Sequence, residues 1–328
     1  MAEKNQDKRY PPNLQGVLKM AMEAGVAPEG AAPVEPMSEE RKTFLKEALA
    51  EVCRGQTDEV EKIKQCLELL HKEEKSERQG EDDEDERESA FNVLTELCEN
   101  LDNARDLMVL GGLDLCHSRY LGHVKSGLRW RAAELIASCA QNMPEVQVHL
   151  LSIGILPKLL QMTDSDPHPT ARVKAFYAVS CLVREQEAGL KAFLTLDGFS
   201  VLVRGIESEN ERLRTKSAFL LLNLLRSHPE QKDTVVSMGI VQQLVSVLRT
   251  PHSSVHEHVL GALCCLVEDC PQGLKDCRNP TLALEELLKQ RTKELGGKEE
   301  CQEELDFCES LGMTCFRGQR SDDNGMDR

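Results

Sequence analysis

"GLRWRAAELIASCAQN", residues 127–142, has apolar residues at the three- and four-residue spacing of a helix. Related stretches return further along the chain: "ARVKAFYAVSCLVRE" at 171–185, "ERLRTKSAFLLLNLLR" at 211–226 and "SVHEHVLGALCCLVED" at 254–269. Matching positions follow one another at steps of 42 (139 − 97, for example): Leu97, Cys139, Cys181, Asn223 and Cys265. One helix repeated at a fixed interval predicts stacked units that bury their apolar faces against each other.

A glycine followed by an apolar residue is the second repeated feature. It occurs at Gly112-Leu113, Gly154-Ile155, Gly198-Phe199 and Gly239-Ile240, and each time another apolar helix follows. Glycine permits the left-handed backbone of a sharp turn between two helices. The unit is therefore a helix, a glycine turn, a second helix, a polar loop and a long third helix. This predicts an all-α, armadillo-like superhelix (an α-solenoid) with helical caps, whose third helices line the concave surface.

Composition agrees with helices and narrows the classes of partner. Of 328 residues only 4% are aromatic, which is low for a β-rich fold, and the formal net charge is −16. That charge disfavours nonspecific binding to nucleic acid or to an anionic membrane. Thirteen cysteines, an odd number, lie on helical patterns, and no apolar signal core or membrane span occurs. We therefore expect free thiols and a cytosolic protein, with the nucleus as a second location.

The chain is expected to divide into five parts. Residues 1–37 form a flexible segment, residues 38–88 a helical cap with an acidic loop at 73–88, and residues 89–280 the repeats. Residues 281–318 form a C-terminal helical cap, and residues 319–328 a disordered tail. Within the first segment one helical face is apolar, and a Pro/Ala linker follows it. That face carries Leu14, Val17, Leu18 and Met22.

Motifs for catalysis, for a metal or for a cofactor are not found. No phosphate-binding glycine loop and no nucleophile elbow occur, so no catalytic residue and no cofactor are predicted. The acidic run 73–88 lacks the central glycine of a calcium loop, so a solvated loop is preferred over a calcium site. The run is interpreted as a mobile loop or as a continuation of charged helix ends. His256 and His258 are two apart and do not share a helix face, so a metal site there has little support. Cys301, Cys308 and Cys315, seven apart, are interpreted as core positions.

The starts of the third helices concentrate positive charge in an acidic chain. Two interpretations remain open: solvated helix edges, or a basic groove wall that attracts an acidic partner. The cations are Arg129, Arg131, Arg172, Lys174, Arg214 and Lys216. Further candidates on the same helices are Leu135, Tyr177, Phe219, Asn223, Glu257 and His258. For Trp130, packing between repeats is preferred over a role as a binding anchor.

Longer stretches resemble a known family. They include "CENLDNARDL", "GLRWRAAELIASCAQN", "RVKAFYAVSCLVREQEAGL", "KSAFLLLNLLRSHPE" and "HEHVLGALCCLVEDCPQG". They resemble the vertebrate family of Hsp-seventy-binding proteins, which are armadillo-type nucleotide exchange factors of seventy-kilodalton heat-shock chaperones. The resemblance covers nearly the whole chain except the first dozen residues and the acidic loop.

The resemblance implies a co-chaperone. It would grip the ATPase domain of the chaperone, promote ADP release and thereby release clients, which inhibits net chaperone activity. The segment of Leu14 to Met22 would mimic a client, as in fungal relatives. The family also links the chain to chaperone-associated ubiquitin ligase complexes. A monomer without nucleic-acid or membrane partners is expected.

A generic armadillo scaffold without exchange activity is the alternative function. Scaffolds that clamp extended peptides carry rows of Asn and Trp on their third helices. In this chain the corresponding row keeps a single Asn, Asn223, and the row four residues earlier holds no Trp. The sequence thus favours the exchange factor over the peptide clamp.

Overall fold

The computed structural model describes residues 58–72, 80–184 and 186–316. The chain divides into two units, Met1–Asp58 and Glu59–Arg328, and nearly all described residues belong to the second. Every regular element among the described residues is a helix. None of these helices combines the length and the apolar composition needed to span a bilayer.

Helices follow one another in triplets, as the repeat predicts. Residues 58–71 are helical and precede α3 (Gly80–Leu97). The first triplet is α4 (Leu101–Val109), α5 (Gly112–Leu115, continued by the π-helical turn Cys116–Tyr120) and α6 (Ser126–Ala140), and the second is α7 (Pro144–Ser152), α8 (Ile155–Ser165) and α9 (Pro169–Val183). The third is α10 (Glu187–Thr195), α11 (Gly198–Ile206) and α12 (Glu211–Ser227), and the fourth is α13 (Lys232–Ser237), α14 (Ile240–Leu248) and α15 (Val255–Val267). The last is α16 (Pro271–Cys277), α17 (Leu284–Leu295) and α18 (Gln302–Phe316).

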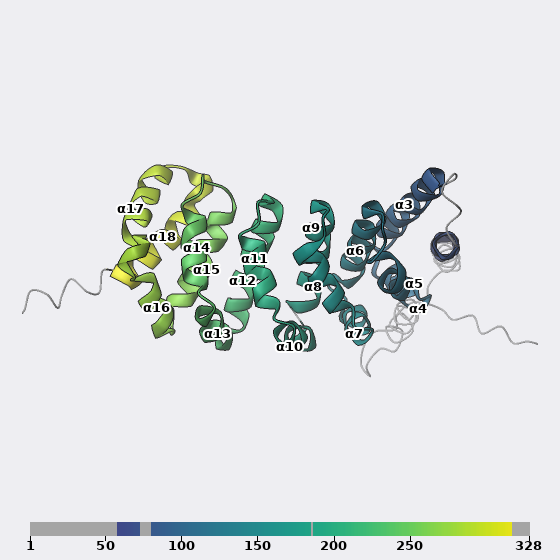
Figure 1. Cartoon of the computed structure of the whole chain (residues 1–328), viewed down its shortest axis with the longest axis horizontal. Coiled ribbons are helices and arrows are strands. Elements are labelled where there is room, and N and C mark those ends of the chain that lie inside the picture. The colour runs from purple at the N-terminus through teal and green to yellow at the C-terminus, as the bar shows by residue number, and fades with distance from the viewer. Residues whose placement is uncertain (1–57, 73–79, 185, 317–328) are drawn as a thin grey trace, which may run out of the picture. The chain divides into compact units, whose positions relative to one another are not determined.

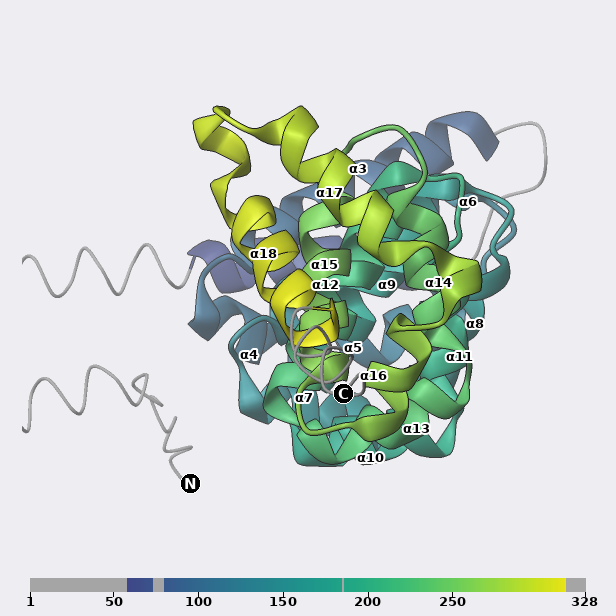
Figure 2. The same ribbon diagram turned by 90° about the vertical axis from the view of Figure 1, so that its left-hand side faces the viewer.

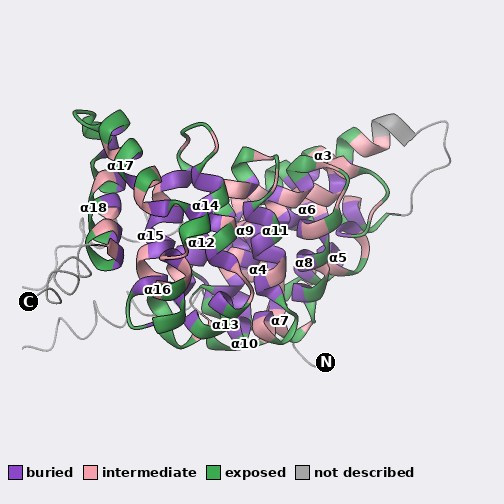
Figure 3. Ribbon diagram, turned by 60° about the vertical axis from the view of Figure 1, so that its left-hand side comes forward, coloured by how far each residue is buried: buried purple, intermediate pink, exposed green. Residues whose placement is uncertain are grey.

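Three layers result from the stacking of these triplets. The third helices α6, α9, α12 and α15 lie side by side, with α3 before them and α18 after them (Figure 1). The second helices α8, α11 and α14 form another layer, and the first helices α7, α10 and α13 a third (Figure 2). Buried residues run through all three layers, whereas loops and helix ends are exposed (Figure 3). Each triplet therefore obtains its core from its neighbours, as expected of a solenoid.

The turns between first and second helices use the left-handed backbone, and two of the four predicted glycines supply it. Gly154 and Gly239 have φ of 73° and 76°, as expected. In the first triplet Gly111 takes this conformation (φ 78°), and in the third Asp197 does (φ 54°), a residue type that tolerates it. Gly198 instead allows close packing, since a Cβ there would lie 2.3 Å from Phe193 Cδ2.

The acidic segment at the start of the array is helical where the structure describes it. Of the two interpretations of the acidic run, a loop or a continuation of charged helix ends, the second holds for residues 80–88, which form the first turns of α3; residues 73–79 lie outside the described residues. Acidic residues suit this position because the N-terminal end of a helix carries partial positive charge. The array thus begins before residue 89.

A buried arginine joins the helix over residues 58–71 to the array. The Arg87 side chain is 1% exposed and donates to Tyr120 Oη at 2.7 Å and to the Lys72 carbonyl at 2.9 Å. Tyr120 Oη donates in turn to the Leu70 carbonyl at 2.6 Å. These donors satisfy carbonyls at the end of that helix, which no residue of the helix itself can bond. Asp83, 3.1 Å from Arg87 Nε, compensates the buried charge.

At the opposite end, a buried polar network joins α17 and α18 to the last repeat. Arg291 Nη1 donates to His256 Nδ1 at 2.9 Å and to Glu304 Oε1 at 2.8 Å. His256 Nε2 therefore carries the ring proton and donates to the Val247 carbonyl at 3.0 Å. His252, His256 and Glu304 place ligand atoms within 4.8 Å of one another, but the Arg291 cation already bonds two of these side chains. The group is therefore an internal network.

His256 should make stability depend on pH. Burial, followed by the Arg291 charge, lowers the pKa of His256 from 6.5 to about 4. Between these values the unfolded chain binds a proton that the folded chain does not, so the free energy of unfolding falls as the pH falls. The loss approaches about 3 kcal/mol near pH 4. Urea unfolding from pH 7 to 4 measures it. The variant His256→Gln, which keeps a donor and an acceptor, should lose less free energy of unfolding over this pH range than the wild type. Equal losses in the two proteins would show that His256 is not the group responsible.

Candidate functional site

The candidate site is the exposed face of the third helices, which we call the third-helix face. It consists of residues of α3, α6, α9, α12 and α15 that are partly or fully exposed. Its members are Glu88, Asn92, Arg131, Glu134, Gln141, Lys174, Tyr177, Arg184, Lys216, Phe219, Asn223, Glu257 and His258.

The exposed stripe advances by 43 residues, not 42, from α6 to α9. Arg131 and Lys174 lie on the face at corresponding positions, and so do Gln141 and Arg184. The predicted row with a step of 42 pairs Tyr177 with Leu135 instead, and Leu135 is fully buried. The prediction that Leu135 contacts a partner is therefore wrong. One residue turns a helix by about 100°, which moves a side chain from the surface into the core.

Three of the six predicted wall cations do not belong to the face. Arg129 makes two hydrogen bonds, of 2.7 and 2.8 Å, to the Asp166 carboxylate in the loop before α9. Arg172 Nε donates to the Thr163 carbonyl of α8 at 2.9 Å. Arg214 is partly buried, with its Nε in the interior. Arg129 and Arg172 thus fasten the starts of α6 and α9 to α8 and the residue after it, so the single basic wall of six cations is not formed.

The face begins with a ladder of ion pairs between successive third helices. Arg131 Nη2 on α6 lies 2.9 Å from Glu88 Oε2 on α3, and Lys174 on α9 pairs with Glu134 on α6. Arg131 also donates to Asn92 Oδ1 at 3.0 Å. Each of these cations is thus neutralised by a carboxylate of the preceding third helix. This part of the face presents paired charge to a partner.

Aromatic rings replace carboxylates from α9 onward. Lys216 Nζ lies 5.1 Å from the centre of the Tyr177 ring, and among the described residues no carboxylate pairs with it. Phe219 is 39% exposed, and its ring centre lies 5.3 Å from that of His258 and 5.7 Å from the Arg184 guanidinium. The Tyr177 ring does not neutralise the Lys216 ammonium, so this part of the face offers positive charge together with the exposed Phe219 ring. Aromatic residues are common anchors in protein interfaces.

The remaining predicted residues have local partners. Asn223 Nδ2 donates to the Phe219 carbonyl of its own helix at 2.8 Å, and Glu257 lies 3.6 Å from the His258 ring nitrogen. Trp130 is half-buried against the core with the Arg131 guanidinium 4.0 Å from its ring, which favours the packing interpretation. The N-terminal candidates Leu14, Val17, Leu18 and Met22 lie outside the described residues.

Five residues of the face were not predicted: Glu88, Asn92, Glu134, Gln141 and Arg184. The cations already contained the signal that locates them, because Arg129 and Arg172, like Arg131 and Lys174, are 43 apart (172 − 129). Aligning the charged positions instead of the small ones would have placed Gln141 beside Arg184, and Glu134 beside Tyr177. Small core residues gave the other register because they are tolerated on several faces of a closely packed helix.

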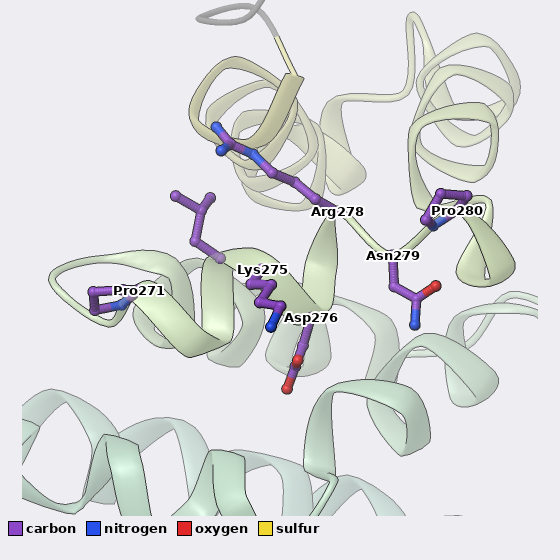
Figure 4. Close-up of a pocket in the computed structure, with 7 residues that line it drawn as sticks. Pro271, Lys275, Asp276, Arg278, Asn279 and Pro280 are labelled. Carbon is purple, nitrogen blue, oxygen red and sulfur yellow. The ribbon is translucent and has the colours of Figure 1, made fainter.

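A cavity of about 500 Å³ lies in the C-terminal repeat, along α16 and the loop after it (Figure 4). Lys275, Asp276 and Asn279 are among its lining residues. Arg278 also lines it, but the guanidinium extends away to donate to the Cys315 carbonyl at 2.7 Å. The lining holds no nucleophile paired with a base, so it offers no chemistry of its own.

Comparisons with known proteins agree with this architecture. The family model described as "Nucleotide exchange factor Fes1" matches residues 14–107, and the "SIL1/FES1/HPBP1 C-terminal domain" matches residues 103–203 and 189–294. Hsp70-binding protein 1 of Mus musculus is 53% identical over 98% of this chain and 90% of its own length. Hsp70 nucleotide exchange factor FES1 of Debaryomyces hansenii is 28% identical over 60% of this chain and 67% of its own.

Solved structures support the fold alone. A designed armadillo repeat protein superimposes with a TM-score of 0.61 over 76% of this chain and 98% of its own, at 16% identity. The triplets of helices, the two family models that together span most of the chain, and the 53% identity to a relative of nearly equal length lead to one assignment. The chain belongs to the SIL1/FES1/HPBP1 family of nucleotide exchange factors.

Proposed function

We propose that this protein binds Hsp70 and promotes the release of ADP from it, as a co-chaperone. The observation that carries the proposal is membership of the family, together with relatives named Hsp70-binding protein 1 and Hsp70 nucleotide exchange factor FES1. Release of ADP would let ATP bind, which frees clients and lowers net chaperone activity. The protein itself acts without catalysis.

The ATPase domain of the chaperone is the proposed target of the third-helix face. An exchange factor must bind the nucleotide-loosened state of its partner more tightly than the closed ADP state, since only a difference in affinity shifts a population. A preformed helical face can supply that difference without touching the nucleotide. Lys216 and the exposed Phe219 ring favour a partner surface that combines carboxylates with apolar groups.

The alternative, a scaffold that clamps extended peptides, is less well supported. Such a clamp needs free amides along the third helices to bond the peptide backbone. Asn223, the single Asn in its row, donates to its own helix instead. The positions that would complete the row are Leu97, Cys139, Cys181 and Cys265, which cannot make the same bonds.

A fluorescent-ADP release assay with the purified Hsp70 ATPase domain tests the proposed function. The full-length protein is expected to raise the ADP dissociation rate in proportion to its concentration, until the complex saturates. Binding without faster ADP release would identify the scaffold instead. No binding at all would reject both functions.

Deleting residues 1–37 should separate two activities. The truncated protein is expected to accelerate ADP release as the full chain does, because the third-helix face is intact. It should release a bound client peptide more slowly, since the deletion removes the apolar segment that contains Leu14, Val17, Leu18 and Met22. Fluorescence anisotropy of a labelled peptide on Hsp70 measures client release. An unchanged rate would remove the client-mimicking role and leave the exchange function in place.

Four further properties belong to the same proposal. The protein is proposed to be a cytosolic monomer, with the nucleus as a second location. It needs no cofactor for exchange, because the chaperone holds the nucleotide. Chaperone-associated ubiquitin ligase complexes are proposed as additional partners, on the family resemblance alone.

A further inference from the structure

Neighbouring third helices are not packed equally. α6 and α9 are in contact along their length, and so are α12 and α15, whereas α9 and α12 touch at far fewer positions. Figure 1 shows the same difference for the third helices, with α12 set apart from α9. We call the boundary between α9 and α12 the seam.

Side-chain size accounts for this difference. Small residues fill α6 and α9 and let the two helices approach closely: Ala132, Ala133, Ala137, Ala140, Ala171, Ala175 and Ala178 are all buried. The buried side of α12 carries leucines instead, among them Leu220, Leu221 and Leu224. On its other side α12 is approached closely at Gly261 of α15, where a Cβ would lie 3.0 Å from Leu222 Cδ2. The seam therefore joins the alanine-rich α9 to the leucine side chains of α12.

A polar bridge is also missing at the seam. Gln147 on α7 donates from Nε2 to the Ala140 carbonyl of α6 at 2.8 Å and to the Cys181 carbonyl of α9 at 3.1 Å, so it joins two third helices. α7 and α10 begin 43 residues apart (187 − 144), so the corresponding residue of α10 is Leu190, whose buried apolar side chain cannot make these bonds.

We propose that the array bends at the seam, with α3–α9 and α10–α18 moving as two rigid bodies. In a solenoid each repeat contacts only its neighbours, so the weakest interface determines where the whole array bends. Packed interfaces adopt discrete arrangements, and a boundary with few interlocked side chains passes between them most easily. This inference concerns the free protein and does not depend on the proposed function.

Bending at the seam would change the third-helix face. Tyr177 and Arg184 lie on the α9 side, and Lys216 and Phe219 on the α12 side, with their side chains meeting across the boundary. A partner that contacts both sides selects one bend angle. This consequence rests on the proposed function: binding of the partner would change the angle between the two rigid bodies at the seam.

Distances between paired spin labels test the bend in the full-length protein. The labels are carried on non-canonical residues, so that the native thiols remain unmodified, and replace exposed residues on helices. The pair Gln161–Gln242 spans the seam, whereas Glu96–Gln161 and Gln242–Glu309 each lie within one body. We expect the distance distribution of the spanning pair to be at least about twofold wider than those of the other two. Equal widths would overturn the proposal.

A matched pair of variants locates the effect. Tyr177→Ala with Lys216→Ala removes the ring and the ammonium that meet across the seam, and should shift or widen only the Gln161–Gln242 distribution. Glu134→Gln, which breaks the pair between α6 and α9, should leave that distribution unchanged. A change of the same size with Glu134→Gln would show that the array bends throughout.

Adding the Hsp70 ATPase domain should narrow the distance distribution of the Gln161–Gln242 pair. If it does not, the proposed role of the bend in partner binding fails, while the bend in the free protein stands.

Discussion

Leu135→Asp is expected to unfold the array under conditions in which the wild type is stable. Leu135 is 0% exposed on α6, so an aspartate there would hold a carboxylate without a partner or water. Burying an unpaired charge costs several kcal/mol, and losing the leucine side chain adds to this, for a total of roughly 4 kcal/mol or more. A domain is stable by only about 5–15 kcal/mol. Circular dichroism during urea unfolding measures the loss.

Tyr177→Asp is the matched control for this substitution. Tyr177 occupies the position of Leu135 in the 42-residue repeat, but its side chain lies on the third-helix face. An aspartate there can remain hydrated, so we expect a loss of about 1 kcal/mol, from the ring contact with Lys216 and the bond to Gln141. Similar losses in the two variants would mean that the one-residue shift between α6 and α9 is wrong.

Lys216→Glu combined with Phe219→Ala is expected to reduce the affinity for the Hsp70 ATPase domain by about 100-fold or more. Truncating a central aromatic residue of an interface commonly costs about 2 kcal/mol, and reversing a charge that faces carboxylates adds further repulsion. Each 1.4 kcal/mol is about tenfold in affinity. Both side chains are exposed, so the fold should tolerate their loss. Titration of the variant in the ADP-release assay measures the effect.

A control variant shows whether the loss of affinity is specific to the third-helix face. Lys64→Glu with Val148→Ala makes the same kind of change at exposed positions of the helix over residues 58–71 and of α7, and should exchange nucleotide normally. Arg131→Glu is a poor probe by contrast, because it places a carboxylate opposite Glu88 and would lower stability as well as affinity. Wild-type affinity of the Lys216→Glu, Phe219→Ala variant, with its melting temperature intact, would show that Hsp70 binds elsewhere than α12.

The sequence alone determined the helical array. Periodicity within a helix, a repeat near 42 residues and glycine at the turns are local properties, since backbone sterics and the burial of one apolar stripe act within a few residues. For the same reason the interpretation of Cys301, Cys308 and Cys315 as core positions was correct, and all three are buried. The start of the array was placed too late, because acidic residues favour the first turn of a helix as well as a loop.

Only the tertiary structure decided which residues form the third-helix face. The repeat of small residues placed Leu135 and Tyr177 in one row, yet one is buried and the other is on the surface. The sequence likewise could not separate Arg129, which is bound to Asp166, from Lys216, which lies over the Tyr177 ring. Both differences depend on how far each helix is rotated about its axis. That rotation is set by the shapes of the neighbouring helices, through contacts between residues about forty positions apart, and no spacing within one helix encodes it.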